Sequence, residues 1–323
     1  MRWGNSLHTH PEYAPWPELA DISISNHCSK GCEFCYRNSI PNQSFMSLKQ
    51  YQFVLDSLHS DQWGNVFQVA LGGGEPLEHP DFEAIILKTV QRGIVVNFTT
   101  NGVNLDKDRA EFLKGKIGAL AISVHRLQDL PFDKIRFLTE AGVRTNLHFV
   151  LNNESLDEAI GILQGSFNKE LSSIDGLVFL TYKPKGRATL ERCLTMDNRL
   201  EKFISLIDAN QCITRIGFDA CFVPVLMNAT NVDTDYIDSC ECGFFSVYID
   251  ETLNVKPCSF ANSDRFTYSL NEYSLQMIWE EKYAGYRNQI ISNQCFSECQ
   301  NKVYCRGKCA YYDTLSFCYE GRR

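Results

Sequence analysis

Apolar and polar residues alternate with two different periods along roughly the first 200 residues of the chain. Short apolar stretches bounded by turn residues predict strands at 19–25, 66–71, 94–98, 118–124, 144–151 and 177–182. Helical spacing predicts helices at 47–58, 80–92, 107–113, 131–141, 156–163 and 198–207. About six strand-helix units therefore predict an α/β fold, with a parallel sheet wrapped by helices through right-handed crossovers.

The length of this region limits the kind of barrel that it can form. A complete eight-unit barrel takes about 250 residues, so a partial (β/α)6 barrel fits better. Nine of the 14 cysteines follow position 220, and this change of composition places a domain boundary near 205–220. We therefore predict a barrel domain at 1–210 and a cysteine-rich iron–sulfur domain at 211–323.

Three cysteines follow the first predicted strand with the spacing C-x3-C-x2-C, at Cys28, Cys32 and Cys35. Three thiolates on one short loop can face one soft metal centre. No fourth cysteine occurs before Cys193, so a four-iron cluster held here has one iron open to a ligand that is not protein. A structural metal knuckle is the alternative.

This spacing, with Phe34 just before the last cysteine, resembles the signature of radical S-adenosylmethionine (SAM) enzymes. In that family the open iron binds the amino and carboxylate groups of SAM, and one electron cleaves SAM to a 5'-deoxyadenosyl radical. The resemblance implies that Cys28, Cys32 and Cys35 are the catalytic set and that Phe34 belongs to the cofactor site.

Further motifs fall just after predicted strands, where the loops of such folds converge. The run Gly72-Gly73-Gly74-Glu75 follows the second strand and lets backbone approach a ligand closely, although a simple turn is the alternative. It resembles the GGE(P) motif of radical SAM enzymes, whose backbone binds the amino group of SAM. Gly73, Gly74 and Glu75 are therefore candidate cofactor residues, and Glu75 can also act by supporting the protein around the site.

Polar residues after the next strands extend this site. The resemblance assigns Asn101, in Thr99-Thr100-Asn101-Gly102, to the ribose of SAM, with a β-turn as the alternative. Ser123 offers a further ribose or carboxylate contact. His148 is a candidate cofactor residue. The alternative, for both His148 and His125, is a hydrogen-bonded, partly buried histidine without a role in the site. The cations of 183–187 either meet a carboxylate of SAM or substrate, or form a solvated turn.

The C-terminal third carries the remaining cysteine pattern. A predicted hairpin over 245–258 has Cys242 and Cys258 at its two ends, which brings them near one another. Cys295, Cys299, Cys305 and Cys309 then follow with the spacing C-x3-C-x5-C-x3-C, and Cys318 lies beyond them. Such density in a chain without an export signal indicates metal ligation, with zinc knuckles as the alternative.

This pattern resembles the SPASM extension of radical SAM enzymes, which carries two auxiliary 4Fe-4S clusters. The resemblance implies Cys258 and Cys309 in the first auxiliary cluster, together with Cys221 and either Cys240 or Cys242. It implies Cys295, Cys299, Cys305 and Cys318 in the second, although the usual C-x2-C is here C-x3-C. Three 4Fe-4S clusters and SAM are thus the expected cofactors. Cys193 and Cys212 are left as free thiols, either small hydrophobic residues or hydrogen-atom donors.

Charge and hydropathy exclude other classes of function. The chain has 31 basic and 39 acidic residues, a net charge of -8, which does not indicate a surface that follows nucleic-acid phosphates. No apolar run has the length of a signal peptide or a membrane span, so we expect a cytoplasmic protein without a membrane partner.

The resemblance implies an oxidoreductase that takes a hydrogen atom from a peptide or protein and installs a cross-link, such as a thioether or carbon–carbon bond. The alternatives are a sulfatase-maturase-like dehydrogenase that forms formylglycine, a peptide epimerase, and an electron-carrying iron–sulfur protein without SAM. A reductant such as flavodoxin or ferredoxin is the second expected partner. About twenty residues precede the first strand, so no separate leader-peptide-binding domain is expected ahead of the barrel.

Overall fold

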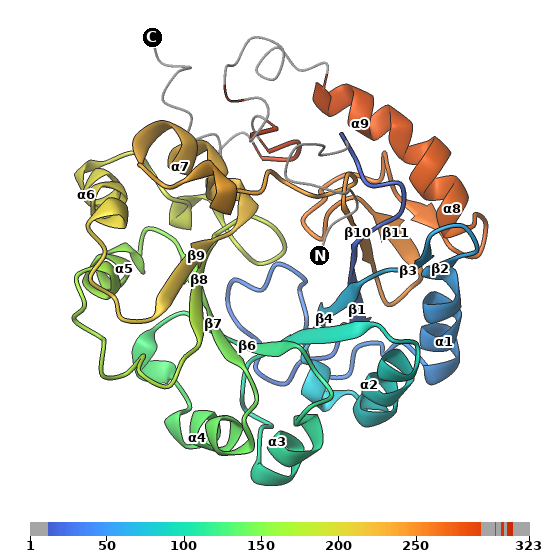
Figure 1. The fold of residues 1–323 in the computed structure, drawn as a ribbon, viewed down its shortest axis with the longest axis horizontal. Coiled ribbons are helices and arrows are strands. Elements are labelled where there is room, and N and C mark those ends of the chain that lie inside the picture. The colour runs from blue at the N-terminus through green and yellow to red at the C-terminus, as the bar shows by residue number, and fades with distance from the viewer. Residues whose placement is uncertain (1–11, 292–300, 302–304, 307–308, 313–323) are drawn as a thin grey trace.

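A computed structural model describes residues 12–291, 301, 305–306 and 309–312 of the chain. Ten strands of the described residues form one sheet, in the order β12-β11-β10-β1-β4-β5-β6-β7-β8-β9. The sheet curves into an open arc, with helices along its outer side (Figure 1). Its strands are β1 (Leu19–Ser25), β4 (Gln68–Gly73), β5 (Val95–Thr100), β6 (Ala119–Val124), β7 (Thr145–Leu151), β8 (Gly176–Thr181), β9 (Arg215–Phe218), β10 (Ser246–Ile249), β11 (Asn254–Lys256) and β12 (Tyr268–Ser269).

The helices mostly follow strands in the predicted alternation. They are α1 (Leu48–Ser57), α2 (Phe82–Gln91), α3 (Lys107–Leu113), α4 (Phe132–Ala141), α5 (Leu156–Leu163), α6 (Asn198–Asp208), α7 (Val223–Ala229), α8 (Leu275–Met277) and α9 (Tyr283–Ile291). A small separate hairpin joins β2 (His59–Ser60) to β3 (Gly64–Asn65). The helices α3 and α5 have the bounds that their sequence spacing predicted. Ser47 caps α1, in a capping box with Gln50.

Neighbouring strands from β10 to β9 run parallel, whereas the pairs β10–β11 and β11–β12 are antiparallel. This largely parallel α/β sheet, open rather than closed, confirms the predicted fold class. On the outer face Phe149 of β7 packs edge-on against Phe179 of β8, which in turn packs against Phe203 of α6. Because side chains alternate along a strand, His148 and its neighbours of the same parity face the concave side.

The C-terminal third of the chain adds strands to both ends of the predicted six-stranded unit. β9 pairs with β8, and β10 pairs in parallel with β1, from Leu19 opposite Ser246 to Ile22 opposite Ile249. The predicted hairpin is present as β10 and β11. One sheet therefore extends across the predicted boundary at 210, and the division into two domains stays a prediction. Among the described residues, no helix has the length and apolar character needed to cross a membrane.

Candidate functional site

The loop after β1 carries the three predicted catalytic cysteines. Cys28, Cys32 and Cys35 are half-buried and form no disulfide. Gly31 turns the loop with a φ of 59°, and the Cys35 N–H donates to the Cys32 carbonyl at 3.3 Å. Burial raises the pKa of the Cys28 and Cys32 thiols, and the nearby Cys28 and Cys35 raise that of Cys32 further. The structure thus brings these three thiols together on one loop.

The glycine run after β4 packs against the chain that leads into this loop. The Gly74 N–H donates to the Ser25 carbonyl at 2.6 Å, and the Glu75 N–H donates to the His27 carbonyl at 2.8 Å. A Cβ at Gly74 would lie 2.0 Å from the His27 carbonyl oxygen, and one at Gly73 would lie 2.2 Å from that of Ser25. The glycines do permit a close approach, as predicted. At Gly73 and Gly74, however, they approach the backbone of Ser25 and His27.

The carboxylate of Glu75 organises the loop that follows β5. Its side chain accepts hydrogen bonds from the Thr100 hydroxyl at 2.6 Å, the Asn101 N–H at 2.7 Å and the Leu77 N–H at 3.1 Å. Glu75 is only 2% exposed, and burial raises the pKa of its carboxyl group. These hydrogen bonds suit Glu75 to its predicted role of supporting the protein around the site.

Asn101 connects this support to the first cysteine. Its Nδ2 donates to the Cys28 sulfur at 3.9 Å, and its Oδ1 accepts from the Val103 N–H at 2.8 Å. An amide donor next to a thiolate stabilises the negative charge that a ligating sulfur carries. The structure thus places Asn101 beside the cysteine loop, as expected of a residue at the carboxyl end of β5.

Glu78 is a residue of this region that sequence reasoning missed. It accepts from the Ser29 N–H at 2.9 Å and from Asn104 at 3.2 Å, and it lies 3.1 Å from His27 Nε2. His27 Nδ1 accepts from the Asn42 N–H, so Nε2 carries the proton that is donated to Glu78. Glu78 thereby holds the cysteine loop against the loop after β5. No motif spacing marks Glu78, because its partners lie on two loops that are distant from it in the sequence.

Arg187 is the second residue that was not assigned to this loop. Its Nε donates to the Cys32 carbonyl and its Nη2 to the Ser39 carbonyl, both at 2.9 Å. At Gly186, a Cβ would lie 2.5 Å from the Cys35 carbonyl oxygen, so this turn packs directly on the loop. Neither alternative predicted for 183–187 describes Arg187, which binds backbone carbonyls of the protein.

Phe34 contacts His125, which follows β6, and two further candidate residues lie within β6 and β7. The Phe34 ring meets His125 edge-on with centroids 4.0 Å apart, and the Arg192 guanidinium lies over it at 5.4 Å. Ser123 stands opposite His148 in the register of β6 and β7. Burial lowers the pKa of His148 to about 4, and its Nδ1 lies 3.4 Å from the Thr99 hydroxyl. His148 is thus a neutral, hydrogen-bonded histidine at pH 7, in agreement with the structural alternative.

Five further thiols gather where the C-terminal third meets the sheet. Cys221 and Cys309 are within hydrogen-bonding distance of each other, and Cys242 is so placed with both Cys240 and Cys258. Cys240 also lies near Cys309, which joins the two groups. These are the five cysteines from which the first auxiliary cluster was predicted, and thiol donors in this number fit an iron–sulfur cluster. Because Cys240 and Cys242 both belong to the group, the arrangement does not choose between them.

The second predicted auxiliary set is described only in part. Cys305 is half-buried, and its N–H donates to the Asn301 carbonyl at 2.9 Å. Cys295, Cys299 and Cys318 lie outside the described residues. Within the described part of the chain, no three histidine, cysteine or acidic side chains are arranged to hold a single metal ion.

Comparison with known families identifies the N-terminal half of this fold. Residues 22–164 match the radical SAM superfamily. The chain carries a radical SAM domain. This domain includes the cysteine loop, the glycine run, Asn101 and His148, and the family implies a 4Fe-4S cluster and SAM as cofactors.

Two curated relatives are similar to this chain over different lengths. The mycofactocin maturase MftC of Mycobacterium tuberculosis (strain H37Rv) is 22% identical over 312 residues, which cover 87% of this chain and 75% of MftC. An S-adenosylmethionine-dependent nucleotide dehydratase of Selenomonas ruminantium is 25% identical over 166 residues, 44% of this chain. The chain spans 60% of the length of that dehydratase.

The fold is shared with a solved structure over nearly the whole chain. SuiB of Streptococcus suis bound to S-adenosylmethionine matches 94% of this chain and 78% of its own, with a TM-score of 0.71 and 19% identity. SuiB bound to its precursor peptide SuiA matches with a TM-score of 0.72 and 17% identity. At this identity the likeness concerns the fold, and it includes the C-terminal third as well as the barrel.

Proposed function

We propose that this protein is a radical SAM enzyme that modifies a peptide or protein substrate, with a SPASM-type C-terminal domain. The convergence of Cys28, Cys32, Cys35 and Asn101 at the carboxyl ends of parallel strands carries this proposal. MftC is named a maturase and SuiB was crystallised with a precursor peptide, so two proteins related in sequence or fold support a peptide as substrate.

The chain's own residues have distinct parts in this chemistry. Cys28, Cys32 and Cys35 would hold the 4Fe-4S cluster, and Gly73, Gly74, Asn101 and Ser123 are proposed to line the SAM site. When bound, the cluster supplies the electron that cleaves SAM into methionine and a nucleoside fragment that takes a hydrogen atom from carbon. Asn101 donates to the Cys28 sulfur, and Glu75 fixes Asn101 in place. Arg187 and Glu78 each hold the cysteine loop through a hydrogen bond to its backbone.

The auxiliary clusters belong to the same proposal. Cys258, Cys309, Cys221 and one of Cys240 and Cys242 would hold the first, which their mutual contacts support. Cys295, Cys299, Cys305 and Cys318 would hold the second. A cross-link, such as a thioether or carbon–carbon bond, is the proposed product. A reductant such as flavodoxin or ferredoxin and a cytoplasmic location complete the proposal.

The decisive experiment measures 5'-deoxyadenosine after anaerobic reconstitution with iron and sulfide, followed by SAM and dithionite. We expect the wild type to form this nucleoside and to hold about twelve irons per chain, as three four-iron clusters require. Cys32→Ala should abolish the product and retain about eight irons. Cys212→Ala, a half-buried cysteine outside the three sets, serves as the matched control and should behave as the wild type. A wild type that forms no 5'-deoxyadenosine would refute the proposed function.

A further inference from the structure

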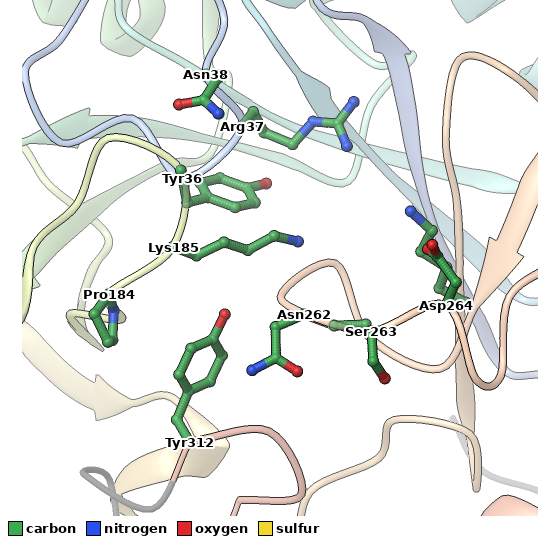
Figure 2. Close-up of a pocket in the computed structure, with 12 residues that line it drawn as sticks. Tyr36, Arg37, Asn38, Pro184, Lys185, Asn262, Ser263, Asp264 and Tyr312 are labelled. Carbon is green, nitrogen blue, oxygen red and sulfur yellow. The ribbon is translucent and has the colours of Figure 1, made fainter.

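A cavity of about 530 Å³ lies between the cysteine loop and the C-terminal third. One wall is formed by Tyr36, Arg37 and Asn38, which follow Cys35 directly. The others come from 184–186, after β8, and from 256–264 with Tyr312, around and after the end of β11. Figure 2 shows Lys185 extending across this space, between the ring of Tyr36 and the side chains of Tyr312 and Asn262. Asn101 and the glycine run do not belong to the described lining, so the cavity is separate from the contact of Asn101 with Cys28.

The charges around this cavity are unbalanced at one position. Arg37, Lys185 and Lys256 line it, together with the exposed carboxylate of Asp264. Arg37 pairs with Glu251, and Lys256 lies 3.4 Å from Asp250. In contrast, Lys185 belongs to no ion pair among the described residues, and its Nζ donates to the Ser259 carbonyl at 2.6 Å. Within the described part of the chain, the Lys185 ammonium group therefore has a neutral hydrogen-bond partner but no carboxylate within ion-pair distance.

The environment of Lys185 disfavours its positive charge. Burial lowers its pKa to about 8. The positive charges of Lys256 and Arg37 act in the same direction, and Cys258 and Asp250 offset them only in part. A partly buried charge is normally paired, because its lost hydration is otherwise uncompensated. The overall charge of the chain is -8, so this group of cations is not part of a generally basic surface. An anionic oxygen from a ligand would supply what is missing.

The walls of the cavity suit an amino-acid residue. The Tyr36 ring stacks on Phe260 with centroids 4.4 Å apart, and the Tyr312 hydroxyl donates to the Phe260 carbonyl at 3.1 Å. These contacts hold the rings of Tyr36 and Tyr312 beside Lys185 (Figure 2). The aliphatic carbons of a ligand can pack against these rings. A volume of about 530 Å³ is in the usual range of small-ligand sites and exceeds the needs of a single small ion.

We propose that this cavity binds a carboxylate of the peptide substrate, with Lys185 as its counter-charge. The inference rests on the proposed function and specifies its substrate class: a peptide with an acidic side chain or a free C-terminal carboxylate near the modified position. The cavity lies between the segments of Cys35 and Cys258, so a group held there is anchored between the catalytic loop and the first auxiliary set.

Binding of three capped tripeptides to the reconstituted, SAM-saturated protein tests this site by anaerobic calorimetry. Acetyl-Ala-Glu-Ala-amide carries a side-chain carboxylate, acetyl-Ala-Ala-Ala a terminal one, and acetyl-Ala-Gln-Ala-amide neither. We expect at least one acidic probe to bind about tenfold more tightly than the glutamine probe, as for a charge-assisted hydrogen bond. The probe that does so identifies the source of the carboxylate.

Two lysine variants complete the experiment. Lys185→Met removes the charge at similar length and should reduce the preference to about twofold or less. Lys88→Met is the matched control, because Lys88, on α2, is also half-buried and belongs to no ion pair with another described residue. Its Nζ donates to the neutral Gln52 side chain of α1 at 3.0 Å. This variant should keep the wild-type preference.

Four results would overturn the inference. These are equal binding of all three probes by the wild type, a preference that survives Lys185→Met, a preference seen only without SAM, and one seen only in Asp264→Asn. The third would assign the cavity to the carboxylate of SAM, and the fourth to the chain's own Asp264, which lines the cavity. Since the readout is binding, each differs from failure of the proposed function, which is the absence of 5'-deoxyadenosine.

Discussion

Asp21 is an acidic residue of β1 whose chemistry is set by its surroundings. Burial raises the pKa of its carboxyl group to about 7, although the positive charge of Arg37 acts in the opposite direction. Between about pH 4 and pH 7 the folded protein therefore keeps a proton on Asp21 that the unfolded chain releases. The contribution of Asp21 to stability is full below about pH 4 and is lost as the pH rises to about 7.

An Asp21→Asn variant should remove this loss, because the amide has no charge to bury. We expect its free energy of unfolding to exceed that of the wild type by more at pH 8 than at pH 5, with the two differences separated by roughly 1–3 kcal/mol. Urea denaturation at both pH values measures this. Asp61→Asn is the control, because the Asp61 side chain is fully exposed and should show no such change. An equal effect of Asp21→Asn at both pH values would contradict the prediction.

Individual residues of the site differ in how far sequence could predict them. Three cysteines at C-x3-C-x2-C limit the possible chemistry by themselves, and Glu75 follows a glycine run that marks a close approach. Glu78 and Arg187 carry no such mark. Their importance comes from hydrogen bonds to Ser29 and to the carbonyls of Cys32 and Ser39, and these depend on loops that only the folded sheet brings together.

The glycine run offers a direct test of how β4 supports the cysteine loop. Gly74→Ala places a methyl group against the His27 backbone, which cannot yield as a flexible side chain does. We expect a loss of roughly 1–3 kcal/mol of stability and weaker SAM binding. Gly72→Ala is the matched control for stability, because a Cβ there meets no atom within 4 Å. Denaturation and SAM titration measure the two effects, and wild-type stability in Gly74→Ala would refute the packing argument.

The loop after β8 makes a second, independent contribution through Arg187. Arg187→Lys retains the charge, but an ammonium on a flexible chain cannot donate to the Cys32 and Ser39 carbonyls in the same fork geometry. We expect faster hydrogen–deuterium exchange over residues 28–40, by about tenfold. Arg215→Lys serves as control, since Arg215 donates to the Asp175 carbonyl at the far end of the parallel strands. Unchanged exchange in Arg187→Lys would show that the loop does not depend on this contact.

Elements with long periodic patterns were predicted well, and short ones were not. The helices α3 and α5 and the six predicted strands bury an apolar face that local spacing reveals. β9 has four residues, too few to show a period. β10 was expected only as half of a hairpin, because nothing in its own sequence shows that its other edge pairs with β1.

Considered as a whole, the molecule should not divide at residue 210 into an independently stable barrel. A 1–210 fragment lacks β9 and β10, so both β8 and β1 would present unpaired edges. We expect this fragment to be aggregated or poorly folded, while the full chain elutes as a folded species. Size-exclusion chromatography and circular dichroism make the comparison. A soluble, cooperatively unfolding 1–210 fragment would show that β10 is not required.

The pairing of β10 with β1 also bears on how the protein is made. Ser23 on β1 donates to Glu251, just beyond β10, across 228 positions of the chain. During synthesis the first strand leaves the ribosome long before its partner exists, and its open edge stays available to other nascent chains in the meantime. We expect chaperones to shield that edge until β10 has been made, so slowed elongation between β1 and β10 should raise the fraction that is lost to inclusion bodies.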